Sequence, residues 1–195
     1  MRSNRLQLNA SKTEVLWCAS ARRQSQLLSD LLAVGSDLVS PVSCVRDLGI
    51  FIDADLTMRT QVTQTCSQCF ATLRQLRSIR RSVSNDVMQL LIVALVFSRL
   101  DYSSTTLAGL PKQLMDRLQS VQNAAARLIF KSCRRDHIKP LLRRLHWLRM
   151  PECISFRLAV LVYRCLHGSA LGYLASDLQR VSHSTHVDDC ALRLH

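Results

Sequence analysis

The chain has 195 residues, with 26 Lys and Arg against 14 Asp and Glu, and a formal net charge of +12. Hydrophobic residues make up 48% and there are 5 Gly and 4 Pro, which excludes a disordered, collagen-like or linker-dominated chain. Aromatic residues account for 5%, too few for the stacking platforms that bind single-stranded nucleic acids. Arginine supplies 22 of the 26 positive charges, and its planar guanidinium pairs with phosphate oxygens two at a time. The composition therefore favours a folded, mostly helical protein whose partner is a polyanion, either nucleic acid or an acidic membrane surface.

The first 57 residues are predicted to form a small β-containing piece. Residues 12–18 are rich in β-branched and apolar side chains and follow a polar turn, which indicates a strand. After a loop, residues 42–45 and 48–52 indicate two further short strands, with a hairpin around Arg46 and Asp47.

The spacing of the apolar residues changes to a helical period at about residue 58. Apolar side chains recur at three- and four-residue steps through residues 62–76, so one face of this helix is apolar. Ser84 indicates the start of a second helix, and Pro111 that of a third, because proline is favoured at the first helical position. Shorter helices are predicted over residues 136–145 and 153–166, the last of them ended before Gly168.

These elements predict a mainly α fold with a small β-containing N-terminal piece. Residues 1–57 form that piece, and residues 58–180 form an array of four or five helices. Residues 181–195 lose the helical period and are predicted to be a disordered tail.

The eight cysteines are scattered through apolar segments, and no secretory signal precedes them, so we expect an intracellular protein with reduced thiols. Nothing in the sequence decides between the nucleus and the cytoplasm. The most apolar run, residues 90–97, is far shorter than the roughly 20 residues of a membrane span, and no membrane partner is expected.

Two sets of residues have the types found in metal sites. Cys66 and Cys69 are separated by two residues, as in a zinc knuckle or a redox pair. A structural zinc site needs two more ligands, and no second pair has the required spacing. The helical spacing of the two cysteines predicts instead that both pack in the core. His183, His186 and Cys190 lie in a polar, aperiodic segment. We therefore predict no metal site.

Positive charge is concentrated in two stretches. Residues 127–149 include eight basic residues and a single acidic residue, Asp136. In a second cluster, arginines follow one another at three-residue steps from Arg74. Arginines on helix surfaces bind nucleic-acid backbones because each neutralised phosphate releases counterions, although a solvated helix face is the simpler alternative. The residues predicted to contact a backbone are Arg74, Arg77, Arg80, Arg81, Lys131, Arg134, Arg135, Lys139, Arg143 and Arg144.

Nucleotidyl transfer needs carboxylates that hold two divalent ions about 4 Å apart. Asp188 and Asp189 are adjacent, like the Asp-Asp pair of polymerases, but they lie near the C-terminus, among Ser, Thr and His residues. Asp53 and Asp55 follow a predicted strand but stand where the chain turns. No third carboxylate precedes either pair in a suitable strand, so we predict no catalytic residue.

Two N-terminal segments, Leu8–Glu14 and Val45–Asp53, resemble the part of non-LTR (LINE-type) retrotransposon reverse transcriptases that follows the catalytic Asp-Asp hairpin. Segments further along the chain are similar to the jockey and chicken-repeat type of these elements, and the likeness covers nearly the whole chain. The segments that carry it are Ser98–Tyr102, Leu107–Pro111, Leu118–Leu128, Leu145–Leu148 and Tyr163–Gly168.

The resemblance implies the C-terminal part of a reverse transcriptase: the end of the palm, the thumb and the region beyond it. Lys12 matches a palm lysine that lies near the incoming triphosphate in the family, and Leu48 and Gly49 match its primer-grip turn. The family's partner is an RNA or DNA template–primer, and its cofactor is Mg²⁺.

The fingers and the catalytic aspartates of the family have no counterpart here. We therefore expect a truncated copy with residual backbone binding, no polymerase activity alone, no cofactor and no small-molecule ligand. A helical protein-interaction module without a nucleic-acid role, and a polymerase completed by a second chain, are the alternatives.

Overall fold

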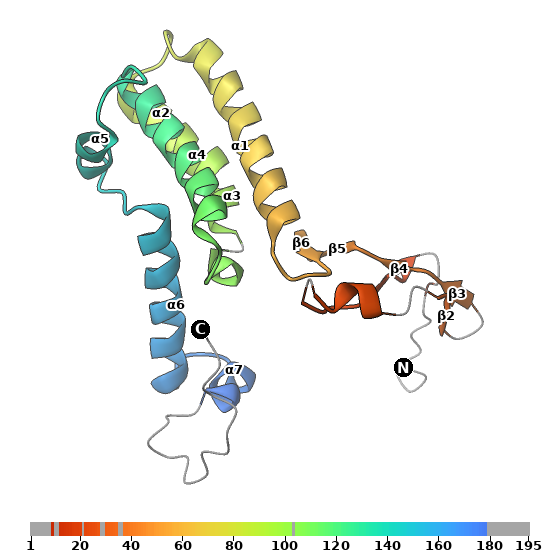
Figure 1. The fold of residues 1–195 in the computed structure, drawn as a ribbon. Coiled ribbons are helices and arrows are strands. Elements are labelled where there is room, and N and C mark those ends of the chain that lie inside the picture. The colour runs from red at the N-terminus through yellow and green to blue at the C-terminus, as the bar shows by residue number, and fades with distance from the viewer. Residues whose placement is uncertain are drawn as a thin grey trace.

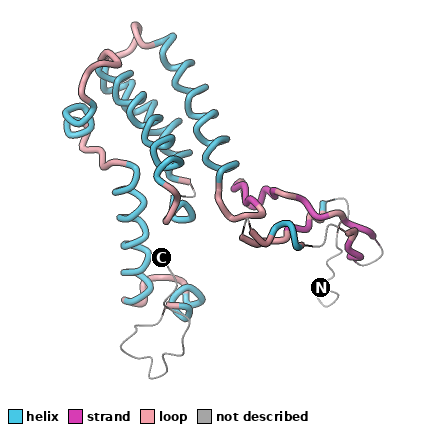
Figure 2. The backbone as a smooth tube through the Cα atoms, in the orientation of Figure 1, coloured by secondary structure: helices cyan, strands magenta, loops and turns pink. Residues whose placement is uncertain are grey.

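The computed structural model describes residues 9, 12–20, 22–27, 30–34, 37–102 and 104–178. This part of the chain is mainly helical, with a small set of strands before the first long helix, as the sequence predicts (Figures 1 and 2). The predicted C-terminal tail, residues 181–195, lies outside the described residues.

The strands form three separate pairs. β1 (Val15–Leu16) pairs in parallel with β4 (Pro41–Val42), and β2 (Leu32–Val34) pairs antiparallel with β3 (Asp37–Val39). A short 3-10 turn, η3 (Gln24–Gln26), lies between β1 and β2. β1 is shorter than the strand predicted over residues 12–18, and the β2–β3 pair falls where the sequence indicates a loop. Strands of two or three residues are too short for an alternating pattern to reveal them.

The third pair is a hairpin close to the one predicted, but its turn lies at Leu48 and Gly49, and Arg46 and Asp47, around which the sequence predicts it, belong to the first strand. β5 (Cys44–Asp47) runs antiparallel to β6 (Ile50–Asp53), with Asp47 opposite Ile50. The predicted strand over residues 48–52 begins two residues too early, because Leu48 and Gly49 form the turn. Their φ angles are 46° and 85°, and two consecutive positive φ values are the geometry of a tight hairpin turn, which a glycine accommodates readily.

The helices begin close to where the sequence predicts them. α1 (Arg59–Ile79) is followed by α2 (Asn85–Ile92), and the Ser84 side chain caps α2 by accepting a hydrogen bond from the Val87 amide at 3.3 Å. α2 continues through a π-helical turn, η4 (Val93–Phe97), into α3 (Ser98–Asp101). The 3-10 turn η5 (Ser104–Leu107) leads to α4 (Lys112–Phe130), for which Pro111 is the cap rather than the first helical residue.

Three helices complete the described chain: α5 (Ile138–Arg144), α6 (Met150–Leu166) and α7 (Gly172–Asp177). α6 begins three residues earlier than predicted because the Glu152 carboxylate accepts a hydrogen bond from the Arg149 amide at 2.8 Å, which caps the helix. α6 ends before Gly168, which has a φ of 68°, as the sequence predicts. The sequence does not predict α7.

The core lies between α1, the continuous α2–α3 helix and α4. Cys66 and Cys69 belong to it, as predicted. The fully buried side chains include Val62, Cys69, Met88, Ile92, Val96, Leu118, Val121 and Ala125.

α1 and α4 run side by side in the same direction (Figure 1). Arg117, near the start of α4, donates a hydrogen bond to Thr63, near the start of α1, at 3.1 Å. Arg80, just beyond α1, donates to Leu128 near the end of α4. Within the described chain, no helix has both the length and the hydropathy to cross a bilayer.

Candidate functional site

A groove of about 980 Å³ lies between α1 and α4, towards the C-terminal ends of both helices. Six arginines and lysines with exposed or half-buried side chains line it, and none of its described lining residues is Asp or Glu. We call it the basic groove. These six cations are Arg74, Arg77, Arg81, Arg127, Lys131 and Arg134, and the buried Arg80 lines the groove as well. Phe70, Ser120 and Asn123 line the part of the groove nearer the middle of the helices, so positive charge is concentrated at one end.

The parallel course of α1 and α4 builds this groove. Arg74, Arg77 and Arg81 lie on one face of α1 and its extension, over about 10 Å of helix length. Arg127 and Lys131 are one turn apart at the end of α4. Both helices present their carbonyl ends here, and the partial negative charge at a helix C-terminus stabilises basic side chains. Two clusters about 50 residues apart in sequence thus become one surface.

Arg80 also lines the basic groove, but unlike its neighbours it is bonded within the chain, and its contact with a nucleic-acid backbone stays a prediction. Its side chain is 5% exposed. The guanidinium donates to the carbonyl oxygen of Leu128 at 2.7 Å and to that of Val83 at 3.0 Å. It also donates to the Asn85 side chain and to the Ile129 carbonyl oxygen. All of these acceptors are protein atoms, so Arg80 joins the end of α1 to the end of α4.

Helix geometry explains why Arg80 differs from its neighbours. At about 100° per residue, position 81 returns to within about 20° of position 74, whereas position 80 is about 120° away. Three-residue steps therefore rotate steadily around a helix instead of following one face. That rotation turns Arg80 towards α4, and it could have been recognised in the sequence.

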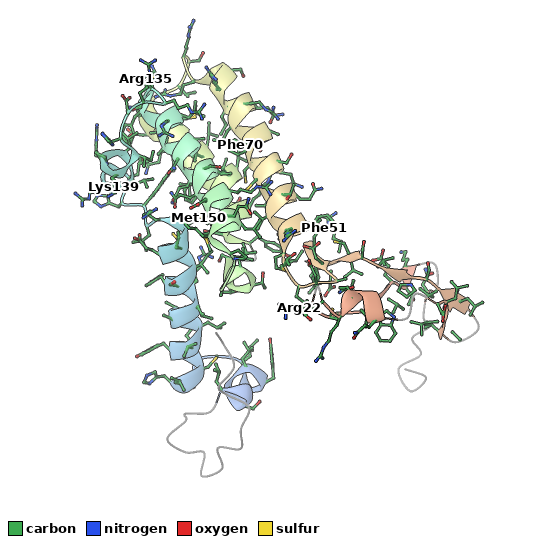
Figure 3. All side chains as sticks on the ribbon, in the orientation of Figure 1. Arg22, Phe51, Phe70, Arg135, Lys139 and Met150 are labelled. Carbon is green, nitrogen blue, oxygen red and sulfur yellow. The ribbon has the colours of Figure 1, made fainter. Side chains whose placement is uncertain are left out.

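Four further predicted contacts lie outside the lining of the basic groove: Arg135, Lys139, Arg143 and Arg144. All four are exposed. Arg144 lies over the Phe130 ring, 4.6 Å from its centroid. In Figure 3, Arg135 lies at the tip of the helical part, and Lys139 projects from α5 on the side away from α1. The basic groove gathers the other six predicted residues, Arg80 included, and adds Arg127, which lies in the predicted basic stretch but is not among the predicted contacts.

The turn at Leu48 and Gly49, for which the sequence predicts a primer-grip role, is held by the helical part of the chain. The Tyr102 hydroxyl donates to the Leu48 carbonyl oxygen at 2.5 Å, and a side chain at position 49 would meet the Tyr102 ring at 3.6 Å. The Phe51 amide donates to the Gln61 side chain at 2.9 Å. Tyr102 of the same chain therefore lies against this turn at a distance that also leaves room for a Cβ, so the positive φ of Gly49 is what favours glycine there.

Lys12, the residue that matches the palm lysine, is exposed near the start of the described chain. Its amide donates to the Asn9 carbonyl oxygen at 3.0 Å. Lys12 lines neither the basic groove nor the pocket beside the hairpin turn.

That pocket, of about 250 Å³, lies between the hairpin, α1 and α3. It is mostly polar: its lining includes Arg46, Gln61, Gln64, Gln68, Arg99 and Tyr102. Arg99 donates to the Thr72 hydroxyl at 2.9 Å, and Arg46 lies over the Phe51 ring, so both cations are already engaged within the chain.

The carboxylates of Asp53 and Asp55 shape the connection into α1. Asp53 is 8% exposed and accepts a hydrogen bond from the Thr60 amide at 3.0 Å. Asp55 accepts from the Thr57 hydroxyl at 2.7 Å and from the Thr57 amide at 3.1 Å, and these hydrogen bonds lower the pKa of Asp55. Across the described residues, no three His, Cys, Asp or Glu side chains are grouped to hold a metal ion. His183, His186, Asp188, Asp189 and Cys190 lie outside those residues.

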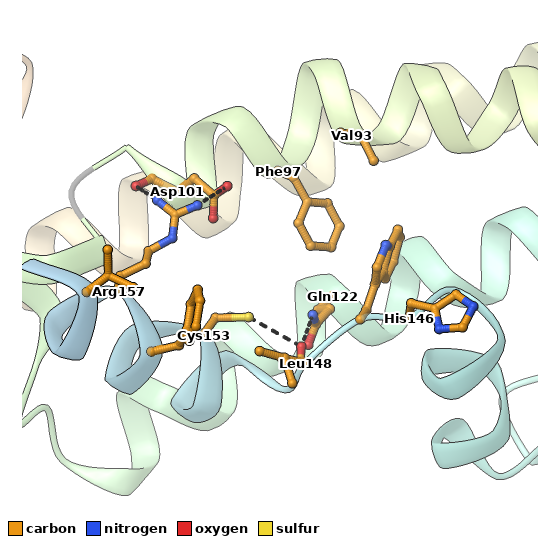
Figure 4. Close-up of a pocket in the computed structure, with 11 residues that line it drawn as sticks. Val93, Phe97, Asp101, Gln122, His146, Leu148, Cys153 and Arg157 are labelled. Carbon is orange, nitrogen blue, oxygen red and sulfur yellow. Dashed lines mark hydrogen bonds and ion pairs between the residues drawn. The ribbon is translucent and has the colours of Figure 1, made fainter. Parts of the chain in front are cut away.

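A third cavity, of about 540 Å³, is mainly apolar and lies between η4 and α6 (Figure 4). Phe97 and Trp147 pack together in its wall, with ring centroids 4.3 Å apart, and Phe156 is 61% exposed beside them. At one end, Arg157 forms an ion pair with Asp101 at 2.5 Å. This apolar surface is chemically unlike the basic groove.

Comparison with known proteins identified no relative of this chain. The chain matches no protein-family model, no curated protein and no solved structure.

Proposed function

We propose that this protein binds the sugar-phosphate backbone of nucleic acid through the basic groove. The observation that carries the proposal is the convergence of six cationic side chains, from α1, α4 and the residues that follow each of them, on one concave surface lined by no described carboxylate. Phosphate oxygens are the ligands that arginine pairs with best.

The lining of the groove favours a duplex over a single strand. Phe70, the aromatic residue of the groove, is half-buried, and single-stranded binders depend on exposed aromatic rings for stacking. Contacts to phosphates position a protein without reading bases, so we expect little sequence preference.

The resemblance to LINE-type reverse transcriptases supports the same proposal. In that family, the helices after the palm hold the template–primer duplex, and the basic groove lies in the corresponding part of this chain. The function proposed is binding of such a duplex, by a thumb-like helical region, and not catalysis of its extension.

The proposal can be tested by fluorescence anisotropy with a labelled 20-base-pair RNA–DNA duplex over a range of salt concentrations. The variant R74Q/R77Q/R81Q removes three charges from the basic groove. The variant R135Q/K139Q/R143Q removes the same charge from exposed positions outside it. We expect the groove variant to weaken binding by tenfold or more, and to lower the slope of log K against log salt by about two to three, because each lost phosphate contact reduces the slope by about 0.9.

The control variant should change the affinity by less than about threefold, through long-range electrostatics alone. Equal losses in the two variants would show that the total charge, and not the basic groove, governs binding. An affinity that does not respond to salt would refute backbone binding.

The apolar cavity favours a second candidate, a helical protein-interaction module. Exposed apolar side chains around a cavity are typical of protein interaction sites. On this hypothesis the chain has no salt-dependent affinity for the duplex, so the same titration separates the two candidates.

A further inference from the structure

Arg127 differs from every other cation of the basic groove. Its side chain is half-buried, whereas Arg74, Arg77, Arg81, Lys131 and Arg134 are exposed. Its Nε atom is buried and has no hydrogen-bond partner among the described residues. Elsewhere in this chain a buried guanidinium is fully engaged: Arg80 donates from Nε and from both of its terminal nitrogens.

The surroundings of Arg127 hold its guanidinium only weakly. One terminal nitrogen lies 3.5 Å from the Asp136 carbonyl oxygen, at the limit of a hydrogen bond. The Asp136 carboxylate forms no ion pair with Arg127 among the described residues, and one of its oxygens accepts a hydrogen bond from the Cys133 amide at 2.7 Å. Arg127 is therefore a cation drawn partly out of water, with one donor unsatisfied and no described carboxylate paired with it.

A partly desolvated arginine without an acceptor gains more from an incoming anion than an exposed one does, because less water has to be displaced from it. Nε and one terminal nitrogen of a guanidinium can bind two oxygens of one phosphate side by side. The weak contact to Asp136 leaves the guanidinium free to turn towards the groove, where an oxyanion would satisfy the Nε donor.

We propose that Arg127 is the anchor of a discrete oxyanion site in the basic groove, at which one phosphate group is held by a two-point contact from Nε and a terminal nitrogen. Lys131, one helical turn further on, adds charge to the same site. The exposed arginines of the groove act as charges that attract the polyanion without fixing its position. This inference rests on the proposed function, because the phosphate expected at this site belongs to a nucleic-acid backbone.

The matched variants are Arg127→Lys and, as the control, Arg135→Lys, which replaces an exposed arginine outside the lining of the basic groove. Each keeps the positive charge and removes the planar guanidinium. The probe is inorganic phosphate, titrated into the full-length chain while the arginine Nε–H signals are followed by NMR. The Arg127 signal is the one that disappears in Arg127→Lys.

We expect a saturable shift of the Arg127 Nε–H signal, and a phosphate affinity about tenfold weaker in Arg127→Lys than in the wild type or in Arg135→Lys. Equal affinities in the two lysine variants, or an Arg127 signal that does not respond, would overturn the inference. Amide spectra of both variants establish that they are folded.

The duplex titration separates this inference from the proposed function. If the groove variant R74Q/R77Q/R81Q loses duplex binding while Arg127→Lys binds phosphate normally, the function stands and the discrete site is wrong. If phosphate binding depends on Arg127 but the duplex does not bind, the site takes free phosphate and the proposed function fails.

Discussion

The Tyr102 hydroxyl lies 2.5 Å from the carbonyl oxygen of Leu48, although 54 positions separate the two residues. This hydrogen bond fixes the β5–β6 turn against the end of α3, and the packing of the Tyr102 ring at Gly49 completes the contact. The hairpin is thus positioned by the helical part of the chain as well as by its own strand pairing.

Tyr102→Phe should loosen the hairpin without unfolding the helices. The loss of one hydrogen bond from a phenol costs about 1 kcal/mol. We expect the Phe51 amide, which donates to Gln61, to exchange its hydrogen faster while amides in α4 keep their wild-type rates. Gly49→Ala should act in the same direction and cost about 1–2 kcal/mol, because φ is +85° at that position. Unchanged exchange at Phe51 in both variants would show that the contact does not hold the hairpin.

Arg80 and Arg81 are adjacent in sequence but should respond to substitution in opposite ways. Arg80→Met removes the donors from four protein acceptors and should lower the free energy of unfolding by about 3 kcal/mol. Arg81→Met should change it by less than about 0.5 kcal/mol, because Arg81 is exposed, and should weaken duplex binding instead. Urea unfolding and anisotropy measure the two effects. A stable Arg80→Met protein with weakened duplex binding would show that Arg80 contacts the duplex and does not hold the two helices together.

The thiol of Cys69 should make the protein less stable in alkali. Burial, followed by the neighbouring Cys66 thiol, raises the pKa of Cys69 to about 11 from its ordinary value of 9.0. Between these values the unfolded chain loses the proton and the folded chain keeps it, so the free energy of unfolding falls as the pH rises from about 9 to 11. Over this pH range, the free energy of unfolding should fall by about 1–2 kcal/mol less in Cys69→Ala than in the wild type, as measured by urea unfolding. Parallel curves would contradict the shifted pKa.

Asp55 should stabilise the fold above its ordinary pKa and lose that effect in acid. The Thr57 hydroxyl and amide lower the pKa of Asp55 in the folded chain, so the unfolded chain takes up the proton first as the pH falls below about 4. In Asp55→Asn this part of the acid destabilisation should be absent. Stability curves between pH 3 and 6 give the comparison, with Asp116→Asn, an exposed position on α4, as the control.

A buried amide network should couple α4 to the start of α6. Gln122 is fully buried and donates to the Leu148 carbonyl oxygen at 2.7 Å, while Gln119 accepts from the Met150 amide at 2.9 Å and donates to Gln122 at 2.8 Å. Gln122→Ala should lower the free energy of unfolding by about 2–3 kcal/mol, because it leaves buried polar groups without partners. The exposed Gln113 on the same helix provides the control, and its replacement by Ala should be nearly neutral. Additive effects of Gln119→Ala and Gln122→Ala would show that the two amides act independently.

The sequence by itself determined the mainly helical fold, the core positions of Cys66 and Cys69, the cap at Ser84 and the presence of a hairpin near residue 47, although not the exact place of its turn. These features follow from local periods, β-rich runs and capping chemistry, all of which act over a few residues. The sequence does not predict the strands β2 and β3 or the helix α7, because these elements are too short to show a period in their apolar residues.

The basic groove required the tertiary structure. Arg74 and Arg127 lie far apart in the chain, and only the parallel packing of α1 on α4 places their side chains on one surface. The same packing turned Arg80 inward and left the Nε of Arg127 buried without a described acceptor. Burial and the supply of hydrogen-bond acceptors depend on what packs against a residue, so identical arginines acquired different roles in the folded chain.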